Sequence, residues 1–138
     1  KVLERLSQAE IVDLLAGARI YLHGSVTLPN GHAEALGLAL LEAQAVGTPV
    51  VAFDSGGVAE AMLPGETGFA VPERDVKAMS RRIATLLADD GQWAGFSAAA
   101  AAMVPDRFAI RRQTALLEDF YDDVLAHHFG VARLGVAA

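Results

Sequence analysis

Two glutamates, Glu34 and Glu42, stand eight positions apart in a largely apolar stretch, residues 32–53. A carboxylate is costly to bury unless another protein group or a ligand pairs with it. Gly37 lies between them, near the predicted start of a helix. Free backbone N–H groups and the helix dipole favour a phosphate there, and glycine allows close approach. Two turns into that helix, the Glu42 carboxylate can accept hydrogen bonds from a vicinal diol, such as that of a ribose.

A purely structural interpretation of the same residues stays open at this point. Glu34 is then a solvated residue at a helix start, and Glu42 pairs with an internal arginine. Adjacent glycines at 56 and 57 do not form a dinucleotide-binding fingerprint, and they favour a shaped turn over a phosphate site. His23 and His32 have no further ligand at metal spacing, so they indicate strand packing and a polar loop, with no metal site.

Short apolar runs alternate with amphipathic segments along the chain. A capping box at Ser7 and Glu10 opens the first predicted helix, and Asp75 is predicted to cap a later one. The predicted strands are residues 19–23, 50–53 and 68–71. The predicted helices are residues 7–18, 36–46 closed by Gly47, 58–63, 76–89, 91–104 and 109–128, with Trp93, Phe96, Phe108, Phe120 and Tyr121 as core.

This order of elements predicts βαβ crossovers, hence an α/β fold with a parallel sheet. Ligands of such sheets bind outside the carboxyl ends of the strands. The loop before Glu34 and the turn at residues 54–57 both follow predicted strands. We therefore expect the loop and the turn to face the same crevice.

Length and composition limit the classes of protein to which this chain can belong. The chain has 138 residues, a net charge of −6 and no cysteine. We expect one partial domain, residues 1–128, and a frayed tail, residues 129–138. The acidic balance argues against nucleic acid as a partner and against docking on anionic lipid. The absence of cysteine agrees with a cytoplasmic protein.

One long segment identifies a family. The residues HAEALGLALLEAQAVGTPVVAFDSGGVAEAMLPGETGFAVPERD, positions 32–75, keep the order and spacing of a known motif series. The series resembles the nucleotide-sugar-binding half of the retaining glycosyltransferases of family four, and the resemblance extends over about residues 7–90. It implies the GT-B fold, of which this chain would be one Rossmann-like half, a parallel sheet with flanking helices that lacks its first strands.

The resemblance also implies roles for single residues. Glu34 matches the family's catalytic-site glutamate, which contacts hydroxyls of the donor sugar near the reacting carbon, and Glu42 matches the glutamate that holds the ribose. The amides of Gly37 and Leu38 match those near the donor phosphates. The expected donor-binding set is therefore Glu34, Ala35, Leu36, Gly37, Leu38 and Glu42.

Four positions depart from the family's pattern, and one of them is Ala59, which replaces the usual proline before Glu60. Ala35 and Leu36 replace its usual glycine and aromatic residue, so the donor pocket has a different shape. Glu4 stands where the family has a glycine in the turn that lines the base pocket. Leu3 and Leu6 remain the candidates for base recognition, and the base itself cannot be inferred.

The implied parent enzyme is a hexosyltransferase of polysaccharide or glycolipid biosynthesis. It transfers a sugar from a nucleoside diphosphate to an acceptor hydroxyl with retention, and no metal cofactor is expected. The acceptor-binding domain and the phosphate-clamping basic residues are missing here, so we expect this chain alone to have no turnover. Any membrane contact would lie in that missing part.

Two other functions stay open. The first is a non-catalytic nucleotide-binding or scaffold module that assembles through an exposed sheet edge, for example as a homo-oligomer. The second is a phosphorylase-type relative on the same fold, which would respond to free phosphate.

Overall fold

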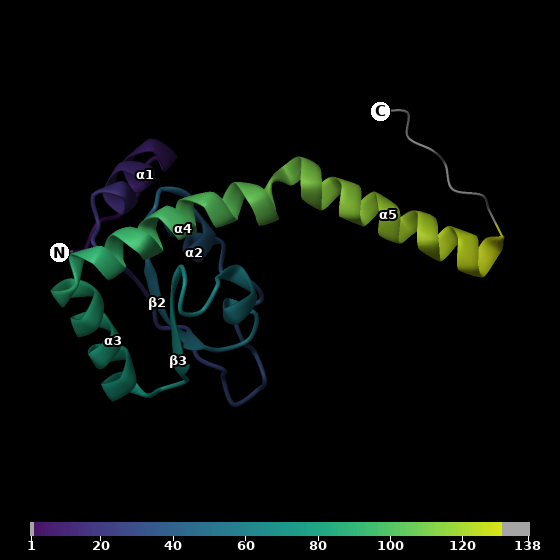
Figure 1. Cartoon of the computed structure of the whole chain (residues 1–138). Helices are drawn as coiled ribbons and strands as arrows, with labels where there is room; N and C mark the ends of the chain where they lie inside the picture. Colours follow the sequence, from purple (N-terminus) through teal and green to yellow (C-terminus); the bar gives the residue numbers. More distant parts are fainter. Residues whose placement is uncertain (1, 131–138) are drawn as a thin grey trace. The chain divides into compact units, whose positions relative to one another are not determined.

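The computed structural model describes residues 2–130 and divides the chain into two compact units, whose boundary in the sequence lies between Val104 and Pro105. The first unit carries most of the secondary structure (Figure 1). Its elements are α1 (Gln8–Ala16), β1 (Tyr21–His23), α2 (Leu38–Ala45), β2 (Val50–Asp54), the 3-10 helix η1 (Val58–Ala61), β3 (Gly68–Pro72) and α3 (Val76–Ala88). Helix α4 (Asp90–Phe108) continues into the second unit, which holds α5 (Ile110–Phe129).

The three strands form one parallel sheet in the order β1-β2-β3. Tyr21 pairs with Val50, and Val50 pairs with Gly68, so the carboxyl ends of all three strands lie at the same edge. The predicted α/β class and parallel sheet are confirmed. In the part of the chain that the structure describes, β1 and β3 are the edge strands.

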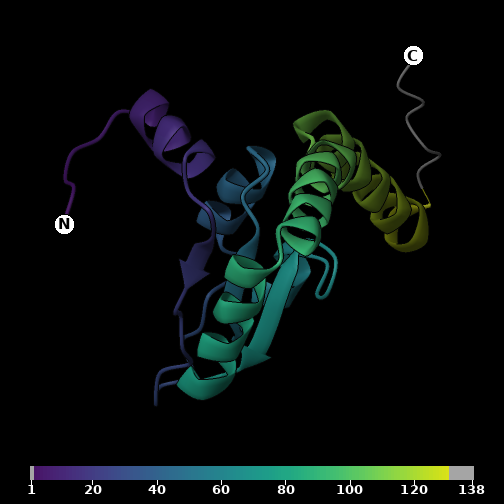
Figure 2. The same cartoon turned by 60° about the vertical axis from the view of Figure 1, so that its left-hand side comes forward.

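Both faces of β2 are buried, as its run of apolar residues predicts for a central parallel strand. Val51 packs with Leu86 of α3 and Phe96 of α4 in one core cluster. Val50 and Ala52 alternate with Val51 and so point to the opposite face, where α2 contacts the sheet. Helix α3 lies against β2 and β3 (Figure 2).

The predicted helix caps form. The Ser7 hydroxyl accepts a hydrogen bond from the Glu10 amide at 3.4 Å, and the Ser7 amide donates to the Glu10 carboxylate at 2.8 Å. The Asp75 carboxylate accepts from the Ala78 amide at 2.8 Å. Gly47, just beyond α2, has a φ of +81°. Local side-chain chemistry therefore sets these helix boundaries.

Two expectations at the C-terminal end are wrong. Helix α4 continues through Pro105 to Phe108, since a proline removes one backbone hydrogen bond but keeps a helical φ. Phe120 and Tyr121, predicted as core, are 61% and 58% exposed. They lie on α5, which has no buried residue, because one helix cannot cover its own apolar face. Residues 131–138 of the expected tail lie outside the described residues.

A buried amide joins α2 to the segments that lead into β3. The fully buried Gln44 donates to the carbonyl of Ala61 at 2.7 Å and accepts from the Thr67 hydroxyl at 2.7 Å. The Thr67 hydroxyl in turn accepts from the Leu63 amide at 3.0 Å. Every polar group of this cluster depends on its neighbour, because no water reaches it.

We expect Thr67→Val to lower the free energy of unfolding by about 1–3 kcal/mol, since the change leaves the Gln44 carbonyl and the Leu63 amide buried and unpaired. Urea unfolding followed by circular dichroism measures this loss. The control is Thr85→Val, whose hydroxyl bonds the Arg81 carbonyl on an exposed helix surface and whose effect should stay within about 0.5 kcal/mol. Equal effects of the two changes would contradict the role of the buried cluster.

Candidate functional site

The loop that carries Glu34 lies against the turn after β2. The Gly57 amide donates to the Glu34 carbonyl at 2.8 Å. A Cβ at Gly56 would lie 2.1 Å from the Glu34 carbonyl oxygen, and a Cβ at Gly57 would lie 1.9 Å from that of Ala35. The two backbones therefore touch, so loop and turn lie side by side, and the crevice that they were expected to face stays a prediction. The glycines shape this contact, as the sequence favoured.

The Glu34 side chain folds back onto its own loop. Its Oε1 accepts from the amides of Ala35 and Gly37, both at 3.1 Å. Its Oε2 lies 3.8 Å from Nε2 of His23, and the side chain is one-third exposed. Glu34 is therefore more than a solvated residue at a helix start, because two backbone amides hold one oxygen and leave the other for a different partner.

Glu42 lies on the exposed side of α2 and is linked to α1. Its Oε1 accepts from Nε2 of Gln8 at 3.2 Å. The partner is thus a neutral amide of the neighbouring helix, not the internal arginine of the structural interpretation. A carboxylate offers about four acceptor positions, so this one contact leaves most of its capacity for a ligand.

Tyr21 of β1 lies near enough to both glutamates for their charges to affect its phenol. Burial raises the pKa of its phenol, and the negative charges of Glu42 and then Glu34 raise it further. The phenol therefore stays protonated at neutral pH and lies close enough to both carboxylates to sense their charge. The charges of Glu34 and Glu42, which are eight positions apart in the sequence, therefore both act on the phenol of Tyr21.

The start of α2 lies between Glu34 and Glu42 in the sequence, and no side chain caps it. Gly37 is the N-cap residue, with a φ of +82° and no side-chain cap. The Gly37 amide itself donates to Glu34, whereas the Leu38 amide, at the first position of the helix, has no intrahelical acceptor. Ala35 and Leu38 are exposed and Leu36 is half-buried, whereas Gly37 is buried, so the predicted donor-binding set is only partly accessible.

One hollow adjoins this stretch, and a second lies at α1. One, of about 290 Å³, is lined by Ser25, Val26, Leu28, His32, Ala33 and Glu34. The other, of about 350 Å³, is lined by Leu3, Leu6, Glu10, Asp13 and Leu14. The structure thus brings the two predicted base-pocket leucines together on a hollow of α1. Neither glutamate lines it, but the same helix carries Gln8, the partner of Glu42.

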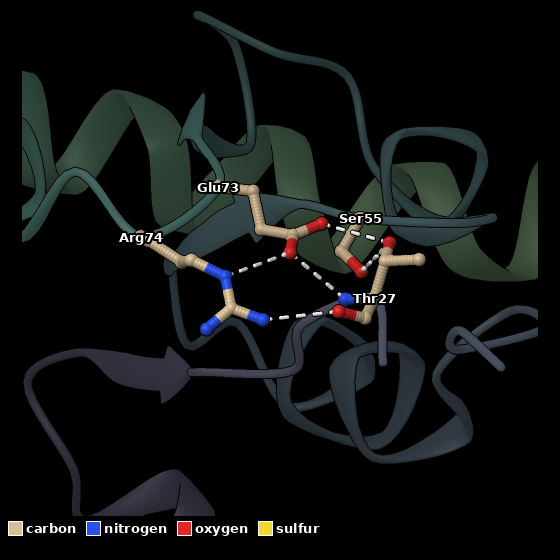
Figure 3. A network of polar contacts seen from close by, with 4 residues as sticks. All are labelled: Thr27, Ser55, Glu73 and Arg74. Atoms are coloured by element: carbon tan, nitrogen blue, oxygen red, sulfur yellow. Dashed lines mark hydrogen bonds and ion pairs between the residues drawn. The ribbon is translucent and has the colours of Figure 1, made fainter. Parts of the chain in front are cut away.

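A polar network that the sequence did not predict joins the ends of the three strands (Figure 3). Thr27, after β1, donates through its amide to Glu73 Oε1 at 2.9 Å and through its hydroxyl to Oε2 at 2.8 Å. Arg74, which has a φ of +67°, donates to the Thr27 carbonyl at 3.0 Å and lies 3.4 Å from Glu73. Ser55, after β2, lies 3.4 Å from the Thr27 hydroxyl.

The network has a clear effect on charge. The hydroxyl and then the amide of Thr27 hold the pKa of the Glu73 carboxyl below its usual range. Because both Glu73 and Arg74 are engaged with Thr27, the network pins the loop that leads to Glu34. Ser55 and Glu73 stand within the motif segment of residues 32–75 and Thr27 precedes it, but nothing in the sequence indicated that these residues meet.

Residues 2–130 contain neither a metal-binding cluster nor a membrane-spanning helix. No three histidine, aspartate or glutamate side chains there are grouped so that they could hold a metal ion. No helix in the same range has both the length and the apolar character needed to cross a membrane.

We expect Gly57→Ala to destabilise the fold by about 1–3 kcal/mol and to shift the amide NMR signals of residues 34–38, because a methyl group would overlap the Ala35 carbonyl. Thermal unfolding and 1H–15N spectra measure both effects. Gly24→Ala is the matched control, since nothing lies within 4 Å of a Cβ at that loop position. Unchanged signals at residues 34–38 in Gly57→Ala would refute the contact.

Glu73 gives a pH prediction with a definite sign. Its folded-state pKa lies below the ordinary 4.5, so its stabilising effect is present above pH 4.5 and is lost as the pH falls through the folded value. We expect the stability difference between wild type and Glu73→Gln to shrink over that acidic range in urea titrations. In a Thr27→Val background the pH-dependent part should be smaller. A difference that is constant with pH would contradict the assignment.

Comparison with known proteins places this geometry in a family. The family model described as glycosyl transferases group 1 matches residues 1–103. A GDP-mannose-dependent monoacylated α-(1-6)-phosphatidylinositol monomannoside mannosyltransferase of Corynebacterium glutamicum is 39% identical over 105 residues, which cover 75% of this chain and 27% of that protein. The putative colanic acid biosynthesis glycosyltransferase WcaL of Salmonella typhimurium is 39% identical over 75 residues, which cover 54% of this chain and 18% of that protein.

A solved structure agrees. HepE of Anabaena in complex with UDP matches with a TM-score of 0.73 and 27% identity, over 84% of this chain and 30% of that one. This chain therefore spans less than a third of the length of each protein named here. The matched family model covers well over half of the chain, and the fold is that of the GT-B glycosyltransferases. The chain belongs to the group 1 glycosyltransferase family.

Proposed function

We propose that this chain is the donor-binding half of a retaining hexosyltransferase, which transfers a hexose from a nucleoside diphosphate to an acceptor hydroxyl. The observation that carries the proposal is the placement of Glu34 and Glu42, which both approach Tyr21 and stand before and after the first turn of α2. Family membership and the solved HepE complexes with UDP and UDP-glucose support it.

Glu34 holds the hexose in this proposal. Its Oε1 is occupied by the amides of Ala35 and Gly37, which leaves Oε2 to accept hydrogen bonds from sugar hydroxyls beside the 290 Å³ hollow. The diphosphate lies at the start of α2, where the Leu38 amide and the helix dipole favour negative charge. The same interactions stabilise the leaving diphosphate as charge develops on it.

Glu42 holds the ribose. Gln8 occupies one of its oxygens, which orients the carboxylate and leaves acceptor positions for the two hydroxyls of a vicinal diol. The hollow lined by Leu3 and Leu6 on the same helix as Gln8 is the candidate site of the base. Its apolar walls suit a planar ring, and Glu10 and Asp13 at its rim supply acceptors for base N–H groups.

The rest of the reaction belongs to the remainder of a longer, cytoplasmic enzyme in this proposal. That part supplies the acceptor-binding domain, any membrane contact and further cations for the diphosphate, so no metal cofactor is needed and this chain alone has no turnover. The activities for which the corynebacterial and WcaL relatives are named support a product that is a glycolipid or a polysaccharide.

One observation favours a second candidate, a scaffold that assembles through its sheet edge. The outer edge of β1 has no partner strand among residues 2–130, and unpaired edges invite pairing with another chain. Light scattering distinguishes the two functions. A stable dimer that ignores every nucleotide favours the scaffold.

We expect one of UDP, GDP or ADP, with its glucose or mannose conjugate, to bind the wild-type chain in a ligand-observed NMR titration. Glu42→Gln should weaken that nucleotide at least tenfold, about 1.4 kcal/mol, because the ribose hydroxyls lose a charged acceptor. Glu66→Gln is the control, since Glu66 is an exposed glutamate just before β3, at the opposite end of the sheet.

The titration can contradict either the role of Glu42 or donor binding by this chain. Equal affinities of wild type and Glu42→Gln would remove Glu42 from the ribose site. A wild-type chain that binds none of these nucleotides would overturn donor binding by this chain.

A further inference from the structure

His23 is a largely buried, but not fully buried, side chain to which the proposed function gives no role. The residue ends β1, and its side chain is 14% exposed. Its Nε2 is inaccessible to solvent and has no hydrogen-bond partner within the described residues. The nearest charged atom recorded for it is Oε2 of Glu34, at 3.8 Å. The sequence indicated strand packing for this histidine, and packing alone gives no role to a nitrogen that faces a carboxylate.

The position of the imidazole proton follows from this contact. A neutral imidazole has one nitrogen that donates and one that accepts. If Nε2 carried no proton, two acceptors would face each other in a buried place, which is unfavourable. With the proton on Nε2, a donor faces a carboxylate oxygen, and closing the gap by about 1 Å makes a normal charge-assisted hydrogen bond. The Tyr21 ring lies beside the imidazole, with centroids 6.3 Å apart and an angle of 29° between the ring planes.

The Glu34 carboxylate therefore has a neighbour on each of its two oxygens. The amides of Ala35 and Gly37 hold Oε1, and His23 faces Oε2. We propose that His23 is a positioning residue for the donor sugar: its Nε2–H orients Oε2 of Glu34, so that the free acceptor positions of that oxygen meet the sugar hydroxyls. This inference rests on the proposed function of Glu34 as the sugar-binding residue.

Imidazole 15N spectra of the full chain test the contact itself. We expect the wild-type His23 signal to show a protonated Nε2. In Glu34→Gln the side-chain carbonyl stays on the two amides and the NH2 group then faces His23, so the proton should move to Nδ1. His127 and His128, on α5, are the internal controls and should not change. An unprotonated Nε2 in wild type, or no change in Glu34→Gln, would overturn the proposal.

Binding of a nucleotide with and without its sugar tests the positioning role. The probes are UDP with UDP-glucose and GDP with GDP-mannose. We expect His23→Leu to weaken the sugar conjugate about tenfold and to leave the free nucleotide unchanged, because Glu34 contacts only the sugar. His23→Gln places an amide N–H near the same point and should restore most of the affinity for the conjugate.

The outcomes separate this inference from the proposed function. If wild type binds the conjugate and His23→Leu binds it equally well, the positioning role is wrong and donor binding stands. If His23→Leu loses the free nucleotide as well, or His23→Gln does not restore the conjugate, the effect is structural and the proposal fails. If wild type binds no probe, the proposed function fails, and the role of His23 fails with it.

Discussion

The site depends on a contact between two backbones. The turn after β2 approaches residues 34 and 35 so closely that a Cβ on either Gly56 or Gly57 would overlap a carbonyl oxygen. This approach, with the hydrogen bond from the Gly57 amide, fixes the backbone of Glu34. Once that backbone is fixed, the side chain reaches the amides of Ala35 and Gly37, and α2 begins one residue later. Gly56 and Gly57, which have no side chain, thus determine where the Glu34 carboxylate and the start of α2 lie.

The parallel sheet explains why these segments meet. Loops after β1, β2 and β3 leave from the same edge, so Thr27, Ser55 and Glu73 come together although 46 residues separate the first from the last. Their hydrogen bonds, with Arg74 closing the cluster, hold the loop that leads to Glu34. The loop is thereby supported by the rigid sheet, which is the arrangement that binding sites generally require.

Carboxylates carry the charge of the candidate site, and backbone amides supply hydrogen-bond donors there. The described stretch offers carboxylates, which suit hydroxyl donors such as those of sugars. It has no lysine or arginine from residue 20 to residue 73, and Arg74 is already engaged by Thr27 and Glu73. Favourable interaction with a diphosphate within this stretch therefore falls to backbone amides and the dipole at the start of α2. His23 and Tyr21, alternate residues of β1, lie near these carboxylates, so even a short strand contributes side chains to the candidate site.

Much of this could be predicted from the sequence, because it depends on near neighbours. The three strands, the caps at Ser7 and Asp75, the αL glycine after α2 and the family motif with Glu34 and Glu42 are all encoded within a few residues. Long-range pairings were not visible. Gln8 on Glu42, His23 beside Glu34 and Thr27 on Glu73 join residues 11 to 46 positions apart, and no local pattern selects those partners. The exposure of Phe120 and Tyr121 was missed for the same reason, since an apolar stripe predicts a buried face but not which element covers it. The sequence by itself determined the elements and the chemical groups; only the tertiary structure decided which groups meet, because contact across a sheet edge depends on register and turn geometry instead of spacing along the chain.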